Sequence, residues 1–317
     1  MKTVEPQICN IAMEEVGVLH AYLAGIAGSK TMIDVGAHHG TAARPFLEDG
    51  WRVYGFEPDV RNHSLLSELA REHPLFHMDP RAVSDVAGEC MPFFTSEEST
   101  GISTLRPFRE SHVKAGEVGV TTLKDFFDDE GISEVDFLKI DVEGFDFSVL
   151  KGMPWASVSP TVVVCEFEDR KTQPLGYTVQ DMIRYMQEHG YTVLVSEWFP
   201  IEAYGSAHRW KRFVSPPCTL ADTGWGNLLC FRDDFSRDLF DEALIEFCGG
   251  FTQNVERRLS NQRKRNALLQ KQVIGLQSDI EAFENSLSWK LTRPLSQAFA
   301  WAKALLHSPP SKARGAR

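Results

Sequence analysis

The sequence has no apolar run long enough to cross a membrane and no cysteine spacing typical of a metal site. A membrane-spanning helix needs about 20 predominantly apolar residues in a row, so an integral membrane protein is excluded. The start of the chain lacks the basic and then apolar segments of a secretory signal. The six cysteines are scattered, without CxxC or CxxH pairs. This argues against a zinc site or a disulfide framework and favours a reducing cytoplasm.

Acidic residues outnumber basic ones, but the two ends of the chain differ in charge. The net charge over 317 residues is −11. Residues 251–317 hold twelve Lys and Arg against four Asp and Glu, a balance of +8, so residues 1–250 carry −19. Because phosphate contacts need clustered cations, we expect no nucleic acid among the partners of the acidic main body.

Short apolar runs of strand length alternate with segments of helical spacing over residues 30–250. Such runs, rich in Val, Ile, Leu and Phe, are typical of a mainly parallel sheet covered on both faces. The sequence therefore predicts a doubly wound α/β domain. Residues 1–29 are expected to form a helical cap whose helix, at 11–28, packs outside the core. The predicted strands are Thr31–Val35, Arg52–Phe56, Leu75–Met78, Val135–Ile140, Val162–Phe167, Tyr191–Val195 and Asn227–Phe231.

Five of these strands have a carboxylate at or just past their carboxyl end. Ligands of open α/β sheets bind outside the carboxyl ends of the strands, so these residues would line an acidic crevice. Such a crevice suits a ligand that bears positive charge and hydroxyl groups. Any one of the residues could instead cap a helix or lie in a solvated loop. They are Asp34, Glu57, Asp79, Asp141 and Glu166.

The first strand leads into a glycine turn with the sequence IDVGAHHG. Gly36 and Gly40 permit a tight turn and close approach of a ligand to the backbone. The spacing is GxxxG and not the dinucleotide fingerprint GxGxxG, and Asp34 would repel a pyrophosphate. Glu57 ends the second strand, where a carboxylate can accept hydrogen bonds from ribose hydroxyls. Together these residues favour S-adenosylmethionine over NAD as the cofactor.

Six motifs occur in an order that resembles the FkbM family of S-adenosylmethionine-dependent methyltransferases. The resemblance covers roughly residues 30–235 and is most specific at KIDVEG and the following VLKG. It implies a class I methyltransferase fold, which is a Rossmann-like sheet of seven strands with the last one antiparallel. It also implies O-methylation of a sugar or polyketide hydroxyl. The motifs are Met32–Gly40 (MIDVGAHHG), Val53–Asp59 (VYGFEPD), Arg81–Asp85 (RAVSD), Thr121–Phe127 (TTLKDFF), Asp136–Phe145 (DFLKIDVEGF) and Val149–Gly152 (VLKG).

The resemblance also implies where the cofactor would lie. It places the turn residues around the methionine moiety, Glu57 at the ribose, and the stretch around Arg81 and Ala82 near the adenine. His38 and His39 lie in the turn, where they would shape the cofactor site or, given their usual pKa, serve as a base. The expected cofactor-binding residues are Asp34, Gly36, His38, Gly40, Glu57, Arg81, Ala82 and Asp141.

Asp141, Glu143 and Glu166 are the candidate catalytic residues. A sugar hydroxyl is weakly acidic, so a base or a charge-stabilising ion should lie near it. Adjacent carboxylates raise one another's pKa, which could prepare one of them as a base. They could also bind a divalent metal, since oxygen ligands suit Mg²⁺ or Ca²⁺. Alternatively, Asp141 caps a helix and Glu143 orients Lys139 or the backbone.

The segment Trp198–Trp225 is rich in aromatic residues and contains the basic stretch His208–Arg212. Sugars stack on aromatic rings, and Arg and Lys bind phosphates, so the segment is a candidate acceptor loop. Its aromatic residues could equally close the core.

Residues 251–288 show a heptad repeat in steps of four and three. Leu259, Asn266 and Val273 occupy a positions, with Leu269 and Leu276 at d positions. This pattern favours a parallel two-stranded coiled coil, and hence a homodimer. A single helix packed on the main domain would show the same stripe.

Residues 289–317 form a basic amphipathic tail with six Lys and Arg, no acidic residue and interleaved aromatics. Such a tail can bind the anionic inner face of a membrane, or a partner enzyme such as a glycosyltransferase. The phrase SLSWKLTRPL at 286–295 resembles tails of bacterial glycan-assembly proteins.

We therefore expect a cytoplasmic O-methyltransferase that acts on a sugar hydroxyl, nucleotide- or lipid-linked, in surface-polysaccharide synthesis. Two alternatives stay open. One is a non-catalytic scaffold with a degenerate methyltransferase fold, and the other is an O-methyltransferase of small molecules or polyketides. The set of Asp34, Gly36, Gly40 and Glu57 argues against the scaffold, because a scaffold needs no cofactor crevice.

Overall fold

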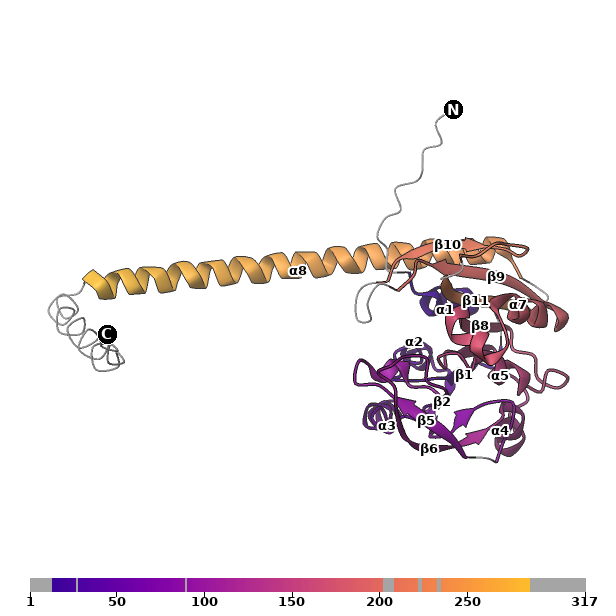
Figure 1. Cartoon of the computed structure of the whole chain (residues 1–317). Helices are drawn as coiled ribbons and strands as arrows, with labels where there is room; N and C mark the ends of the chain where they lie inside the picture. The colour runs from indigo at the N-terminus through magenta and orange to yellow at the C-terminus, as the bar shows by residue number, and fades with distance from the viewer. Residues whose placement is uncertain are drawn as a thin grey trace, which may run out of the picture. The chain divides into compact units, whose positions relative to one another are not determined.

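An eight-stranded sheet forms the centre of the first unit of the chain (Figure 1). The computed structural model describes residues 13–26, 28–88, 90–201, 208–221, 224–232 and 235–285. The strands are β1 (Thr31–Val35), β2 (Arg52–Phe56), β3 (Phe76–Asp79), β7 (Phe137–Ile140), β8 (Val162–Glu168), β9 (Tyr191–Trp198), β10 (Trp210–Val214) and β11 (Trp225–Arg232).

The strand order is β10-β9-β11-β8-β7-β1-β2-β3. The five strands from β3 to β8 are parallel, and β11 runs antiparallel to both β8 and β9. All seven predicted strands are present, with the last one reversed, which confirms the class I methyltransferase fold. The eighth strand, β10, was not predicted and pairs with β9 at the edge of the sheet.

Helices cover both faces of this sheet. On one face lie α1 (Glu15–Ala24), α2 (Arg44–Glu48), α3 (His63–Glu72) and the first turns of α8 (Arg237–Asn285). On the other face lie α4 (Leu123–Glu130), α5 (Asp146–Lys151) and α7 (Val179–Glu188). Side chains of β1 alternate between these layers, with Met32 facing the first and Ile33 facing the second.

The N-terminal helix is shorter than predicted and belongs to the core. The expectation of a helix over 11–28 outside the core is wrong, because Val18 and Leu19 of α1 are fully buried. Tyr22 of the same helix packs edge-on against Phe231 of β11. The apolar side of α1 therefore covers the sheet next to the first turns of α8.

A second, three-stranded sheet lies between β3 and α4 in sequence and was not predicted. It has the order β4-β6-β5, formed by β4 (Ala82–Val83), β5 (Cys90–Thr95) and β6 (Val113–Thr121). The connection between β5 and β6, residues 96–112, contains the short helix η1 (Thr100–Ile102). Its backbone pairs with β5 through Phe94 and Thr104. We call residues 96–112 the cover segment, because it forms part of the cavity wall described below.

The chain after Gly249 forms a second unit. The structure describes it as far as Asn285, as part of the helix α8, and the predicted coiled-coil residues 251–285 are helical. The predicted basic tail, 289–317, lies outside the described residues. Among the described helices, none is both long and apolar enough to cross a membrane.

Candidate active site

A cavity of about 200 Å³ lies at the carboxyl ends of β1, β2 and β7. Its wall combines apolar side chains with the polar groups of the glycine turn and the strand ends. Six of the eight residues predicted to bind a cofactor line it, namely Gly36, His38, Glu57, Arg81, Ala82 and Asp141. Asp34 and Gly40 are not part of this wall, so any role of theirs in binding would be indirect.

Two glycines shape the turn after β1 because both have left-handed backbone conformations. Gly36 has φ +86°, and a Cβ at this position would clash with the carbonyl oxygen of Asp141. Gly40 has φ +73°, and its Cβ would clash with the side chain of Leu69 in α3. Gly36 therefore allows the turn to approach the loop after β7, and Gly40 allows α3 to pack against it.

The Glu57 carboxylate holds this turn from the end of β2. Its Oε2 accepts a hydrogen bond from the backbone N–H of His38 at 2.8 Å, and its Oε1 accepts one from Asp59 at 2.7 Å. The side chain is buried, and burial raises its pKa above the ordinary value for a glutamate. A carboxylate has about four acceptor sites, so Glu57 keeps acceptor capacity beyond these two bonds.

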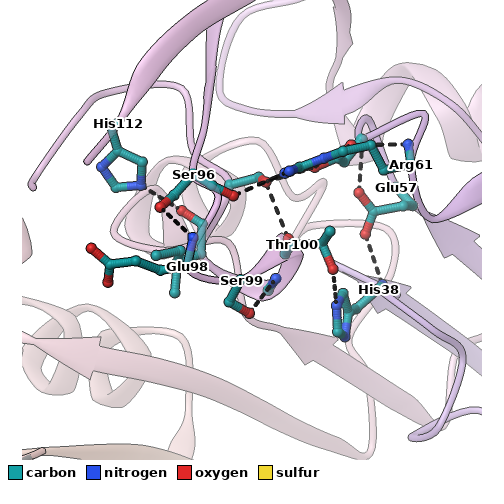
Figure 2. A network of polar contacts seen from close by, with 12 residues as sticks. His38, Glu57, Arg61, Ser96, Glu98, Ser99, Thr100 and His112 are labelled. Carbon is teal, nitrogen blue, oxygen red and sulfur yellow. Dashed lines mark hydrogen bonds and ion pairs between the residues drawn. The ribbon is translucent and has the colours of Figure 1, made fainter. Parts of the chain in front are cut away.

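The cover segment is joined to the glycine turn and to the β2 end by polar contacts (Figure 2). The His38 Nε2 lies 2.7 Å from the hydroxyl oxygen of Thr100 in η1. Arg61 pairs with Asp59 at 2.6 Å and donates to the backbone carbonyl of Ser96 at 3.1 Å. Burial, followed by the neighbouring His39, lowers the pKa of His38, which favours its neutral form.

Several of the carboxylates predicted to form an acidic crevice are neutralised by adjacent cations. Asp34 is fully buried, and its carboxylate lies 3.0 Å from the ammonium of Lys139, which also donates to the Gly36 carbonyl at 3.0 Å. Asp79 pairs with Arg81 at 2.6 Å. The expectation that all five line a crevice is therefore wrong, since only Glu57 and Asp141 form part of the cavity wall.

The loop after β7 places two of the predicted catalytic residues in the wall of the cavity. Asp141 and Glu143 both line it. Glu143 has φ +57°, which is rare for a residue other than glycine. Asp146 stabilises the loop, because its carboxylate accepts from the backbone N–H of Gly144 at 3.1 Å. Asp146 is buried, and desolvation, together with the charge of Glu166, raises its pKa to about 8.

Glu166, the third predicted catalytic residue, lies behind this loop and not in the cavity wall. Carboxylate oxygens of Asp141, Glu143 and Glu166 lie within 4.8 Å of one another. Burial raises the pKa of Glu143 to about 7 and that of Glu166 to about 8. The structure thus brings the three predicted catalytic residues together. The side chain of Asp141 is 47% exposed.

Sequence reasoning missed the cation of this cluster. The ammonium of Lys171 lies 2.6 Å from Glu143 and 3.1 Å from Glu166. Lys171 belongs to the short helix α6 (Asp169–Thr172), which follows β8 directly. A lysine five residues after Glu166 was the available signal, because such spacing keeps both residues near the same strand end. Its contact with Glu143, far away in sequence, carries no such signal.

The candidate acceptor loop, Trp198–Trp225, is described only in part, since residues 202–207 and 222–223 lie outside the described residues. Where it is described, Lys211 and Arg212 both pair with the buried Glu197 at 2.7 Å, and Arg209 lies over the ring of Phe199. Trp198 and Trp225 stack on each other with ring centroids 5.4 Å apart. These contacts favour the alternative in which the aromatic residues close the core.

Solved methyltransferase structures resemble this fold at low sequence identity. Solved structures that match include the precorrin-6y C5,15-methyltransferase of Geobacter metallireducens, with 11% identity, a TM-score of 0.36, and 73% of this chain and 94% of that chain covered. Magnesium protoporphyrin IX methyltransferase of Synechocystis PCC 6803 matches with 11% identity, a TM-score of 0.36, and coverages of 69% and 78%. No curated protein matches the sequence significantly.

The model of the FkbM methyltransferase domain matches residues 34–193, about half of the chain. The match begins in β1 at Asp34 and continues through the cavity-lining loops into β9. On this evidence, the chain belongs to the FkbM methyltransferase family.

Proposed function

We propose that the protein is an S-adenosylmethionine-dependent O-methyltransferase that acts on a sugar hydroxyl. The observation that carries this proposal is the cavity at the strand ends, whose wall combines the Gly36 turn, the Glu57 carboxylate and the Glu143 carboxylate. The first two suit a nucleoside cofactor, and the third can act as a base toward a hydroxyl. Membership of the FkbM family supports the reaction class.

The residues of the cavity fit this cofactor in their chemistry. Glu57 is buried at the wall and retains acceptor capacity for ribose hydroxyls. Ala82, Phe93 and Leu105 supply apolar surface against which an adenine ring can pack. The carboxylate of Asp141, in the same wall, suits the positive end of the molecule. When bound, S-adenosylmethionine supplies a methyl group that is already activated for displacement.

The chain's own residues would align the acceptor, exclude water and remove a proton. Of the predicted catalytic carboxylates, Glu143 meets two requirements of a base, because it lines the cavity and its pKa is raised to about 7. A base works best when its pKa lies near the operating pH. We assign the hydroxyl proton to the Glu143 carboxylate, while Asp141 and Glu166 lie beside it.

The choice of a sugar hydroxyl in glycan or surface-polysaccharide synthesis rests on sequence resemblance. The tail motif at 286–295 is similar to those of bacterial glycan-assembly proteins. A small-molecule or polyketide hydroxyl is the alternative substrate. A non-catalytic scaffold is the alternative function, although a scaffold has no need of a cavity lined by the Gly36 turn, Glu57 and Glu143.

The chain's partners and location are further parts of the proposal. The described residues Leu269, Val273 and Leu276 of α8 are exposed, and they fall on the a and d positions of the heptad. A parallel homodimer would bury them. We place the protein in the cytoplasm, with the basic tail binding the inner face of the membrane or a glycosyltransferase.

Calorimetric titration with S-adenosylmethionine and with S-adenosylhomocysteine tests this proposal. We expect micromolar binding of both to the full-length protein. Absence of binding to protein with a native circular dichroism spectrum would contradict the enzymatic proposal and favour the scaffold. If both ligands bind, the acceptor is sought by incubating the enzyme and S-adenosylmethionine with nucleotide-linked and lipid-linked sugars and measuring methyl incorporation.

A further inference from the structure

Lys171 is a buried lysine whose ammonium lies among the acidic residues behind the cavity. Its side chain is 2% exposed. Its Nζ lies 2.6 Å from Glu143, 3.1 Å from Glu166 and 3.0 Å from Glu168. Arg170 also pairs with Glu168 at 2.7 Å, so Glu168 contacts two cations.

The contact between Lys171 and Glu143 helps to maintain a strained backbone conformation at Glu143. Glu143 has φ +57°, a conformation that costs free energy in a residue with a Cβ and persists only when its surroundings enforce it. The Thr104 hydroxyl of the cover segment donates to the Glu143 carbonyl at 3.2 Å, and Lys171 holds the carboxylate. Glu143 is thereby held at its backbone by Thr104 and at its carboxylate by Lys171.

The ammonium of Lys171 contacts Glu143 and Glu166, two of the carboxylates that could bind a divalent metal, so the metal would compete with Lys171 for them. Oxygen atoms of Asp141, Glu143 and Glu166 lie within 4.8 Å of one another, which is close enough to bind a single cation. Mg²⁺ and Mn²⁺ prefer such oxygen ligands at about 2.0–2.2 Å. Two of the three carboxylates already contact Lys171 at hydrogen-bond distance, so a divalent ion would have to displace a fixed positive charge.

We propose that Lys171 is the built-in cation of this cluster, a positioning residue that holds Glu143 at the cavity wall and takes the place of a divalent metal. This inference rests on the proposed function, in which Glu143 receives the proton of the acceptor. It implies that the methyl transfer needs no added metal. It also implies that removing the ammonium creates a metal site, because Glu143 and Glu166 would lose their cation and the nearby Lys139 contacts Asp141 only at 3.9 Å.

Manganese binding, measured by electron paramagnetic resonance on the full-length protein, tests this proposal. We expect wild-type protein to leave Mn²⁺ free at concentrations up to a millimolar. Lys171→Met removes the charge at similar side-chain length, and it should bind one Mn²⁺ at least tenfold more tightly than wild type. Lys171→Arg keeps the charge and is the matched control, which should exclude Mn²⁺ as wild type does.

Two outcomes of the manganese titration would overturn the proposal. One is tight Mn²⁺ binding by wild type that Glu166→Gln abolishes, a result that does not depend on the folding of any Lys171 variant. The other is a folded Lys171→Met protein, with a native circular dichroism spectrum, that binds Mn²⁺ no better than wild type.

Titration of wild type with S-adenosylhomocysteine separates this inference from the proposed function. If the cofactor analogue does not bind, the methyltransferase proposal fails, whereas the competition between Lys171 and Mn²⁺ is measured independently. If it binds and wild type requires Mn²⁺ for methyl transfer, the role given to Lys171 fails and the proposed function stands.

Discussion

The backbone N–H of His38 donates to the Glu57 carboxylate at 2.8 Å, which joins the turn after β1 to the end of β2. This bond orders the part of the cavity wall where a nucleoside would lie. Glu57 therefore anchors the turn, and in the proposed function it would also accept hydrogen bonds from the cofactor.

Replacement of Glu57 by Gln should weaken cofactor binding. The amide retains one acceptor oxygen but loses the charge, and a lost charged hydrogen bond costs about 1–3 kcal/mol. Titration calorimetry with S-adenosylhomocysteine measures this change. Glu72→Gln, at an exposed glutamate of α3 that pairs with Arg44, is the control and should bind like wild type. Equal affinities of the two variants for S-adenosylhomocysteine would show that Glu57 does not bind the cofactor.

Gly36→Ala should destabilise the protein more than an equivalent change at Gly50. Both glycines have positive φ, +86° and +76°, so both substitutions incur the left-handed penalty of about 1–2 kcal/mol. Only at Gly36 does the new Cβ also clash with the Asp141 carbonyl, since nothing lies within 4 Å of it at Gly50. We expect a further loss of about 1–3 kcal/mol at Gly36, measured by urea unfolding. A similar loss at both sites would show that the turn adapts.

Ionisation of the Asp146 carboxyl group should lower the free energy of unfolding as the pH rises from 6 to 9. Its pKa is raised to about 8 by burial, whereas an unfolded aspartate ionises near pH 4. Between these values the folded state binds more protons than the unfolded state, so the free energy of unfolding falls with increasing pH.

Asp146→Asn removes this titration and should reduce the fall between pH 6 and 9 by about 2–3 kcal/mol. Urea unfolding at both pH values provides the comparison. Asp128→Asn, at an exposed aspartate that pairs with Lys124, is the control and should leave the fall unchanged. If Asp146→Asn loses as much stability as wild type, its carboxyl is not protonated in the folded state.

Leu276→Asp should dissociate the proposed dimer, and Ile274→Asp should not. Both residues are exposed on α8, but Leu276 occupies a d position and Ile274 lies outside the heptad stripe. Light scattering coupled to size exclusion gives the mass of each. A monomeric wild type would contradict the dimer, and loss of the dimer in both variants would point to a different helix face.

The main sheet could be predicted because its strands are buried on both sides. β1 and β2 have the bounds expected from their apolar runs alone. β6 gave no such signal, because most of its side chains are exposed and the sequence VKAGEVGVT reads as a loop. β10, with the sequence WKRFV, was missed because two adjacent cations, Lys211 and Arg212, interrupt its apolar run, and both pair with Glu197.

The sequence allowed the carboxylates of the candidate site to be predicted, but not the cations that pair with them. Asp34, Asp141 and Glu166 were found from their places at strand ends. The sequence indicates where a strand ends, whereas the reach of a long lysine side chain depends on packing. Lys171 contacts Glu143 across 28 positions, and only the fold brings these residues together.

The position of β11 has a consequence for shortened versions of the protein. β11 hydrogen-bonds to β8 on one side and to β9 on the other, although it comes last of the three in sequence. A protein cut at Val193, where the family match ends, would lose β11 and leave β8 as a free edge. The β8 sequence VVVCEFE is wholly buried in the intact fold. Its unpaired backbone and valine-rich surface would then promote aggregation, so the domain should be kept intact at least through Arg232.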